Sequence, residues 1–262
     1  MFYIDTHTHL YLNAFDDDRH EAVKRAIAHG VHYMLLPNID SVSIEPMHKL
    51  CNDFPANCFP MMGLHPTSVK ENWQEELQLV ENHLAKGGYC AVGEVGLDFY
   101  WDTTFKTEQE MVFRRQIELA VEYQLPLVIH SRKAMDEIIM IVKEMMAPGL
   151  TGVFHCFSGS PEQAKRIVEL GFKLGIGGVV TFKNSKLGAT IQAVGLGHLV
   201  LETDSPFISP APYRGKRNES AYIPLIAAHI AQFFGVTTGE VAEVTTNTAL
   251  SVFNSLAVQT KQ

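Results

Sequence analysis

Eight short apolar runs recur along the chain, and stretches with helical periodicity separate them. Most of the runs are apolar throughout and do not alternate with polar residues, which is typical of strands buried on both faces of a parallel sheet. We therefore predict eight strands, at Phe2–Asp5, Val31–Leu36, Cys58–Gly63, Tyr89–Gly93, Leu125–Ile129, Gly152–Phe154, Phe172–Ile176 and His198–Leu201.

The segments between these runs carry signals for helix starts. Thr107 with Glu110 fits a capping box for a helix that runs to about Tyr123, and Ser160 with Gln163 fits a second box. Further helices are predicted at residues 16–29, 72–86, about 221–234 and about 239–253.

Strands that alternate with helices predict an α/β fold with a parallel sheet. Eight strands in 262 residues favour a closed (β/α)8 TIM barrel, which needs about 250 residues, over an open doubly wound sheet. No Gly-x-Gly-x-x-Gly follows the first strand, which weakens the dinucleotide-binding alternative. No linker divides the chain, so we predict one domain over residues 1–262, with a polar tail from about 255 to 262.

Composition narrows the class of protein further. The longest apolar runs are far shorter than the ~20 residues that cross a bilayer, and the first lacks a basic flank, so we expect neither a membrane span nor a signal peptide. Four cysteines without a close pair do not make a disulfide scaffold, which favours a cytoplasmic protein. The net charge of −8 argues against non-specific coating of nucleic acid but leaves room for a local basic groove.

Candidate metal ligands recur where the predicted strands end. His7 and His9 follow the first run, and residues two apart in a strand point to the same side, so both imidazoles can reach one ion. In a barrel, the carboxyl ends of all strands meet at one face, where active sites lie. Residues of the same chemical types follow later runs: His65, Glu94, His130, His155 and Asp204.

These side chains suit a site for two divalent ions. Neutral imidazoles and carboxylates bind Zn, Mn or Fe, and carboxylates also bind Mg. A carboxylate such as Glu94 can bridge two ions about 3.5–4 Å apart, and the ions lower the pKa of a bound water. Asp204 can then bind a metal, accept the proton of that water, or do both. The other seven histidines lie within or beside predicted helices or at strand starts, where a structural or surface role is expected.

A basic segment follows Asp204. It places Arg214, Lys216 and Arg217 on the predicted loop after the last strand, and Arg132 follows the fifth strand. Guanidinium groups bind phosphate oxygens in pairs, so the loop favours a phosphate-containing substrate, with a solvated surface loop as the alternative. Nearby aromatic residues can stack on a base or pack in the protein, and both readings stay open: Tyr100, Trp101, Phe207 and Tyr213.

The motifs as a set resemble those of the TatD family of metal-dependent hydrolases, within the wider amidohydrolase-like barrel superfamily. They extend over nearly the whole chain, from Asp5-Thr6-His7-Thr8-His9 to Asn247-Thr248-Ala249-Leu250, and include Gly63-Leu64-His65-Pro66, Gly93-Glu94-Val95-Gly96-Leu97-Asp98, Ile129-His130-Ser131-Arg132, His155-Cys156-Phe157-Ser158-Gly159 and Glu202-Thr203-Asp204-Ser205-Pro206. Many amidohydrolase relatives place a carboxylated lysine after strand four, and Glu94 in its place favours the TatD branch. The family's basic loop commonly ends Arg-Asn-Glu-Pro, whereas this chain reads Arg217-Asn218-Glu219-Ser220.

The resemblance implies a TIM barrel that holds two divalent ions per subunit, with Mg, Mn and Zn as the candidates. By similarity, the metal ligands are His7, His9, Glu94, His130, His155 and Asp204, with Glu94 bridging. The predicted catalytic residues are Asp204, Glu94 and His65. The predicted substrate-binding residues are His65, Arg132, Arg214 and Arg217.

The family resemblance further implies a deoxyribonuclease that cleaves DNA phosphodiester bonds, as a 3′→5′ exonuclease on single-stranded DNA or 3′ ends; some members cut at abasic sites. The same activated water also serves an amidohydrolase or esterase, such as a D-aminoacyl-tRNA deacylase, with the basic loop holding the tRNA end. A non-enzymatic metal-binding scaffold is a third alternative, and the intact set of ligands argues against it. A monomer is compatible with the sequence.

Overall fold

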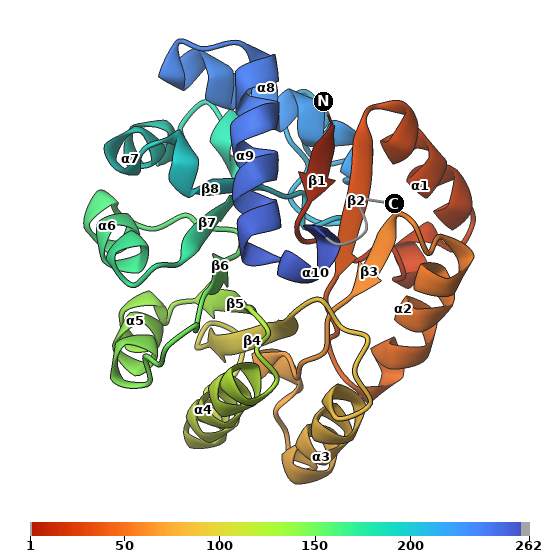
Figure 1. The fold of residues 1–262 in the computed structure, drawn as a ribbon, viewed down its shortest axis with the longest axis vertical. Coiled ribbons are helices and arrows are strands. Elements are labelled where there is room, and N and C mark those ends of the chain that lie inside the picture. Colours follow the sequence, from red (N-terminus) through yellow and green to blue (C-terminus); the bar gives the residue numbers. More distant parts are fainter. Residues whose placement is uncertain (1, 258–262) are drawn as a thin grey trace.

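The computed structural model describes residues 2–257, in which eight parallel strands alternate with helices (Figure 1). The strands are β1 (Tyr3–Asp5), β2 (Val31–Leu36), β3 (Cys58–Pro60), β4 (Val92–Asp98), β5 (Leu127–Arg132), β6 (Gly152–Phe154), β7 (Lys173–Ile176) and β8 (Leu199–Leu201). The α-helices are α1 (Arg19–Ala28), α2 (Ser41–Asp53), α3 (Trp73–Leu84), α4 (Lys106–Glu122), α5 (Met135–Glu144), α6 (Pro161–Glu169), α7 (Leu187–Val194), α8 (Ile223–Phe234), α9 (Thr238–Val252) and α10 (Asn254–Ala257). Short 3-10 helices are η1 (Asn13–Phe15), η2 (Pro66–Ser68), η3 (Gly178–Thr181), η4 (Leu196–His198) and η5 (Ser220–Tyr222).

Single backbone bridges close the strands into a barrel. β1, β2 and β3 form one parallel sheet, and β4 to β8 form another in chain order. Met62 pairs with Val92 across the gap between β3 and β4, and Thr8 pairs with Ser205 across the gap between β8 and β1. Every strand therefore lies beside its neighbours in the chain, and the predicted (β/α)8 barrel is confirmed.

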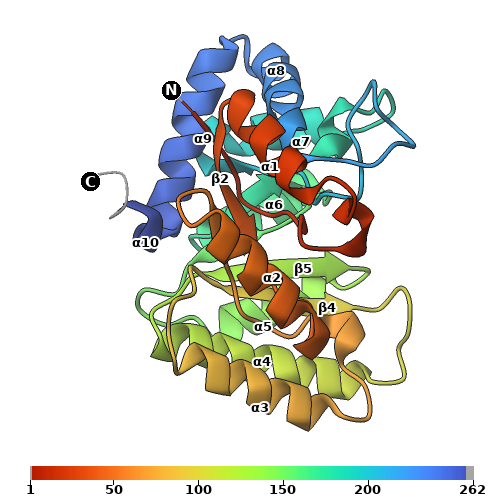
Figure 2. The ribbon, with the colours of Figure 1, turned by 90° about the vertical axis from the view of Figure 1, so that its right-hand side faces the viewer.

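The last two helices close one end of the barrel. Val252, Phe253 and Leu256 are buried in the cluster of side chains that fills the barrel interior, and the Thr246 hydroxyl donates to the carbonyl of Phe2, just before β1. Figure 1 shows α9 and α10 lying across this amino-terminal end, and Figure 2 shows the loops beyond β1, β4 and β8 on the opposite side. The carboxyl ends of the strands are therefore left for a functional site.

The predicted polar tail needs a correction. Residues 254–257 form α10, and Leu256 is only 1% exposed, because it packs against the barrel interior. The remainder of the predicted tail, residues 258–262, lies outside the described residues. No single helix among the described residues is long and apolar enough to span a bilayer; residues 220–234 and 238–252 reach that length and composition only together, across a bend of 106°.

Two side-chain caps explain where the later helices start. Ser160 accepts a hydrogen bond from the Gln163 N–H, and the Gln163 side chain accepts one from Ser160, which confirms the predicted capping box of α6. Thr237 and Glu240 form the same arrangement at α9. These local signals fix the start of each helix to one residue.

The predicted capping box of Thr107 with Glu110 does not form. α4 begins at Lys106, and no side chain caps its first turn. The carboxamide oxygen of Gln109 instead accepts a hydrogen bond from the N–H of Asp98, 2.9 Å away, at the end of β4. This contact draws the first turn of the helix against the barrel, which a local sequence pattern does not reveal.

Candidate metal centre

Two histidines beyond β1 converge on one point. The chain bends at Thr6 and His7, and backbone hydrogen bonds then hold it on both sides: the N–H of Thr8 donates to the carbonyl of Leu35 in β2, and the N–H of His9 donates to the carbonyl of Ser205, beyond β8. The imidazoles of His7 and His9 converge, and their Nε2 atoms lie 3.2 Å apart. Both imidazoles are buried.

Glu94 lies inside β4 and not after it, which corrects the predicted end of that strand at Gly93. The register between β4 and β5 shifts between Gly93 and Val95, so Glu94 is an extra residue in the ladder. Bulges of this kind re-aim a side chain beside active sites. A carboxylate is rarely buried in a strand, but here imidazoles replace the water that it would otherwise need. His130 is likewise inside its strand, because β5 continues to Arg132.

The two oxygens of Glu94 face different histidines. Oε2 lies 3.2 Å from His7 Nε2 and 3.5 Å from His9 Nε2. Oε1 lies 2.7 Å from His155 Nε2 and 2.9 Å from His130 Nδ1. One carboxylate therefore joins two sets of potential metal ligands.

Asp204 and His65 complete the two groups. Asp204 Oδ1 lies 3.7 Å from His7 Nε2 and 3.6 Å from His9 Nε2, and His65 Nε2 lies 3.4 Å from Glu94 Oε1. Ligand atoms within 4.8 Å of one another define three overlapping groups: His7, His9 and Glu94; His7, His155 and Asp204; and His65, Glu94 and His130. The structure thus brings every predicted metal ligand, and His65, into one cluster.

Three buried residues behind the histidines were not singled out from the sequence. The Tyr11 hydroxyl lies 2.8 Å from His9 Nδ1 and donates its proton to the carbonyl of Pro37, 2.6 Å away. It therefore accepts the Nδ1 proton of His9, which leaves His9 Nε2 free to bind a metal.

The other two are carboxylates. Asp98 Oδ2 lies 3.0 Å from His130 Nε2, and Glu202 Oε1 lies 3.7 Å from His155 Nδ1. Carboxylates behind metal-binding histidines fix the orientation of the ring and raise its basicity. Both residues stand in the sequence motifs around Glu94 and Asp204, but only the fold brings them against His130 and His155.

Burial and mutual contact set the charges in the cluster. Burial lowers the pKa of His7 well below its usual value, so this imidazole is neutral. Burial opposes ionisation of Glu94, but the surrounding histidines, His155 first, outweigh it and hold the Glu94 pKa well below its ordinary range. Burial also disfavours a charged His155, yet Glu94 and Glu202 raise its pKa well above the usual value. Burial raises the pKa of Asp204 to about 6. Positive charge placed between the carboxylates, on His155 or on a bound cation, is therefore favourable in this cluster.

The donor set fits divalent cations. Imidazole nitrogens and carboxylate oxygens are ligands of Zn, Mn and Fe, and carboxylates also suit Mg. Within residues 2–257, three buried atoms of the cluster have no hydrogen-bond partner: His7 Nδ1, His155 Nδ1 and Glu202 Oε2. The chain thus does not satisfy these groups by itself, as is expected where ions or waters complete the network.

Two of the predicted phosphate-binding arginines lie against aromatic rings. The guanidinium of Arg132, the last residue of β5, is 4.1 Å from the ring centroid of Tyr100 and 4.9 Å from that of Trp101. The guanidinium of Arg214 is 4.2 Å from the Phe182 ring. Among the described residues, neither arginine has a carboxylate within 4.0 Å, so their N–H groups are available to an anion.

Arg217 is engaged in an ion-pair network. Its two terminal nitrogens lie 2.7 and 2.8 Å from the two oxygens of Asp18, and its guanidinium covers the ring of Phe15. Arg25 of α1 joins Asp18 to Glu219 through contacts of 2.8 and 2.6 Å. Arg217 thus ties the loop beyond β8 to the segment before α1, with its planar face and nitrogens occupied by the protein.

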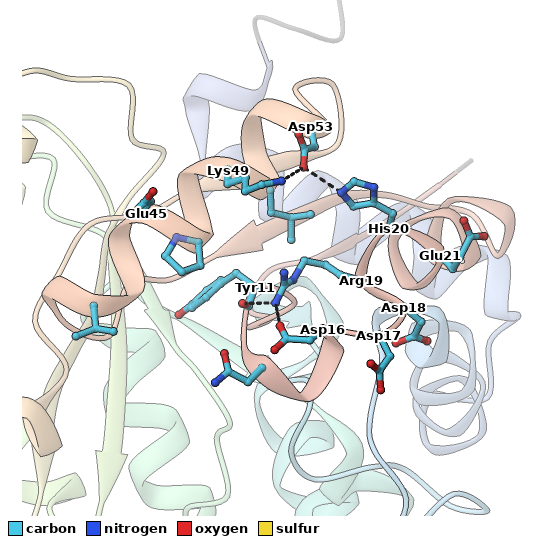
Figure 3. A pocket seen from close by; sticks show the side chains of 14 residues that line it. Tyr11, Asp16, Asp17, Asp18, Arg19, His20, Glu21, Glu45, Lys49 and Asp53 are labelled. Carbon is cyan, nitrogen blue, oxygen red and sulfur yellow. Dashed lines mark hydrogen bonds and ion pairs between the residues drawn. The ribbon is translucent and has the colours of Figure 1, made fainter.

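A pocket of about 610 Å³ adjoins the cluster but contains none of its potential ligands (Figure 3). It lies beside α1 and α2, and its cations are paired with acids: Arg19 with Asp16 at 2.7 Å, and Lys49 with Asp53 at 3.2 Å. Tyr11 lines the pocket and reaches the cluster through its hydroxyl. The residues suited to metal chemistry therefore lie outside this pocket, at the carboxyl ends of the strands.

A parallel barrel with histidines and carboxylates gathered at the carboxyl ends of its strands is typical of metal-dependent hydrolases. The model of the family described as TatD related DNase matches residues 4–254. The chain belongs to the TatD family of metal-dependent hydrolases.

Similar proteins support the same class over nearly the whole chain. The uncharacterized metal-dependent hydrolase YabD of Bacillus subtilis (strain 168) is 36% identical over 250 residues, which cover 95% of this chain and 98% of that protein. The uncharacterized metal-dependent hydrolase YjjV of Escherichia coli (strain K12) is 31% identical over 255 residues, 96% of this chain and 98% of that protein. The crystal structure of YjjV, a TatD homolog, matches with a TM-score of 0.90 at 30% identity, over 96% of this chain and 98% of that chain.

Proposed function

We propose that this protein is a two-metal-ion phosphodiesterase that cleaves DNA, acting on single-stranded DNA or 3′ ends. The observation that carries the proposal is the position of the Glu94 carboxylate, because its Oε2 faces His7 and its Oε1 faces His155. Glu94 would then bridge two ions, one beside His7, His9 and Asp204 and the other beside His130 and His155. Membership of a family whose model is described as TatD related DNase supports DNA as the substrate.

When bound, the two ions would supply a water of lowered pKa and positive charge for the phosphate oxygens. Asp204 accepts the proton of the attacking water, because its side chain faces the first histidine group and is still 14% exposed. The N–H of Thr67 donates to Nδ1 of His65, which places the proton of a neutral His65 on Nε2, as a donor to the substrate phosphate. Arg214 holds a flanking phosphate. Arg217 is left out of this role because Asp18 occupies its nitrogens.

Cleavage of end-labelled DNA tests the proposal. The purified protein is supplied with Mn²⁺ or Mg²⁺ and incubated with single-stranded DNA labelled at its 5′ end. We expect stepwise shortening from the 3′ end, and a loss of about 10²-fold or more in rate for Glu94→Gln and for Asp204→Asn. Glu169→Gln, a change at an exposed glutamate of α6, is the matched control and keeps the parent rate. Equal cleavage by the parent and both site variants would overturn the proposal.

A second substrate separates phosphodiester hydrolysis from ester hydrolysis. The same activated water can attack a carboxylic ester, and Glu94 is needed in either case, so the variants alone do not distinguish the two reactions. D-aminoacyl-tRNA is therefore offered to the same preparation of protein and metal. We expect DNA to be cleaved and the aminoacyl ester to stay intact. The reverse result would assign a deacylase function and remove DNA as the substrate.

A further inference from the structure

We propose that Tyr100, Trp101 and Arg132 form a stacking platform for an unpaired nucleobase next to the cleaved phosphodiester; this inference rests on the proposed phosphodiesterase function. Tyr100 is 52% and Trp101 is 67% exposed, although both are large aromatic side chains. Their rings meet edge to face with centroids 4.9 Å apart, and the Arg132 guanidinium packs against both. The Arg132 guanidinium thus supports Tyr100 and Trp101, and much of the surface of both rings remains exposed to solvent.

Asp98 joins this platform to the metal centre. Its Oδ1 accepts hydrogen bonds from the N–H groups of Tyr100, at 2.9 Å, and Trp101, at 3.3 Å. Its Oδ2 lies 3.0 Å from Nε2 of the predicted metal ligand His130. Arg132 stands opposite Asp98 in the β4–β5 register, two residues beyond His130. A base stacked on the platform is therefore held at a set position relative to the metal ligands.

A hollow beside the platform has the size of a site for one nucleotide. It has a volume of about 290 Å³ and is lined by Thr67, Lys70, Asp98, Trp101, Asp102 and Gln109. This volume is just below the range for small-molecule pockets, about 300–1,000 Å³, so it suits a single nucleotide at most and not a duplex. Lys70 is half-exposed and lies 2.8 Å from Asp102, so its ammonium is already paired with a carboxylate and is not counted as a phosphate ligand.

A further exposed aromatic ring lies across the centre from the platform. Phe207 is 50% exposed, and its ring lies 6.2 Å from the ring of His9. Phe207 follows β8, whereas the platform follows β4 and β5, on the other side of the eight-stranded ring. A nucleic-acid strand bound across the candidate metal centre would thus meet aromatic rings on both sides. Unpaired bases offer free faces to such rings, while stacked pairs in a duplex do not, so the arrangement selects single-stranded nucleic acid.

Tryptophan fluorescence tests the stacking contact without relying on catalysis. The chain has two tryptophans, and the other one, Trp73, is partly buried against the core, so Trp73→Phe leaves Trp101 as the only reporter. The probe is oligothymidylate with phosphorothioate linkages that resist cleavage. We expect strong quenching with this probe, and none with a duplex or with an abasic oligomer of the same length. Binding of the probe, measured by anisotropy, without any quenching would overturn the platform.

Kinetics on single-stranded DNA provide an independent measurement. Trp101→Ala should raise KM about 5- to 150-fold and leave kcat largely unchanged, because a stacking contact contributes to binding and not to the chemical step. Trp101→Phe should keep most of the affinity. Met140→Ala, which removes an exposed apolar side chain on α5, is the control and keeps the parent KM. An unchanged KM in Trp101→Ala would contradict the platform.

The two measurements distinguish failure of this inference from failure of the proposed function. Quenching of Trp101 fluorescence by the probe, together with intact DNA in the cleavage assay, would reject the phosphodiesterase and retain the platform. Cleavage of DNA by the parent, with no quenching and an unchanged KM in Trp101→Ala, would reject the platform and retain the phosphodiesterase.

Discussion

Individual hydrogen bonds decide which imidazole nitrogen faces the metal centre. Tyr11 takes the Nδ1 proton of His9, so His9 presents an unprotonated Nε2. The N–H of Thr67 donates to Nδ1 of His65, so a neutral His65 presents a protonated Nε2 instead. Both histidines follow a strand, yet the first is prepared as a metal ligand and the second as a hydrogen-bond donor.

Tyr11→Phe tests this assignment at the scale of a single atom. Removal of the hydroxyl takes away the acceptor for His9 Nδ1, and we expect the Mn²⁺ affinity to fall about 10- to 100-fold, as for other partners behind metal ligands. Titration calorimetry with Mn²⁺ measures the affinity. Tyr123→Phe, at the end of α4, removes a hydroxyl far from the centre and should bind Mn²⁺ like the parent. Equal affinities for all three proteins would show that Tyr11 does not position His9.

Contacts between elements position the loops around the centre. The bulge at Glu94 turns one residue of β4 out of its ladder, so that the carboxylate reaches histidines from β5, β6 and the end of β1. The Asp18–Arg217 pair joins the segment before α1, which follows His7 and His9, to the loop that follows Asp204. The segment that follows His7 and His9 is thereby joined to the loop that follows Asp204.

Asp18→Asn tests this tie, and its effect depends on pH. Hydrogen bonds from Arg217, with Arg25 adding to them, hold the pKa of Asp18 well below its ordinary value of about 4. A depressed carboxyl pKa stabilises the fold above the unfolded-state pKa, and this contribution is lost as the pH falls through the folded-state pKa. We expect Asp18→Asn to lower the free energy of unfolding by about 1 kcal/mol at pH 7, or the melting temperature by about 2–4 °C.

The difference between Asp18→Asn and the parent should shrink as the pH is lowered below about 4, because the Asp18 carboxylate of the unfolded chain then takes up a proton while the folded state still holds it ionised. Thermal unfolding followed by circular dichroism at a series of pH values measures it. Asp17→Asn, at the exposed neighbouring position, is the control and should follow the parent at every pH. A constant deficit in Asp18→Asn across this range would contradict an electrostatic tie.

The two ends of the barrel have different roles: one end is closed by apolar packing, and the other carries the candidate metal centre. α9 and α10 close the amino-terminal end with apolar side chains, while the polar cluster and the exposed aromatic rings gather at the carboxyl end. The net charge of −8 also limits general attraction for DNA, so under the proposed function DNA binding would depend on the few local cations and would be weak. Burial, with repulsion from Glu94 and Glu202, raises the pKa of Asp204, and a cation bound beside these carboxylates would relieve that repulsion.

Metal binding should therefore stabilise the whole fold. At a free Mn²⁺ concentration of 100 times the Kd, we expect about 2.7 kcal/mol of added stability, or a rise in melting temperature on the order of 5–10 °C. Differential scanning calorimetry with Mn²⁺ and with a chelator measures the rise. Glu94→Gln should lose most of it, whereas Glu169→Gln should keep it. The same melting temperature in Mn²⁺ and chelator would contradict a metal centre formed by this cluster.

The local pattern of apolar residues was sufficient to predict features that depend on neighbours in the sequence, such as the positions of the strands. Apolar runs located the eight strands, and β2 and β6 have the predicted bounds. It was insufficient at the ends of β4 and β5, because a charged residue usually marks the end of a buried strand and Glu94 does not. It also failed at α4, whose start depends on a contact between Gln109 and Asp98.

The sequence by itself determined the barrel, the family and the residue types of the candidate centre, because buried parallel strands leave apolar runs and their carboxyl ends meet at one face. Only the tertiary structure decided which Glu94 oxygen faces which histidines, that Asp18 occupies Arg217, and that Tyr11, Asp98 and Glu202 stand behind the imidazoles. Tyr100 and Trp101 could have packed in the protein, and the fold leaves them exposed beside the centre. These outcomes depend on contacts between distant segments, and a local pattern does not specify such contacts.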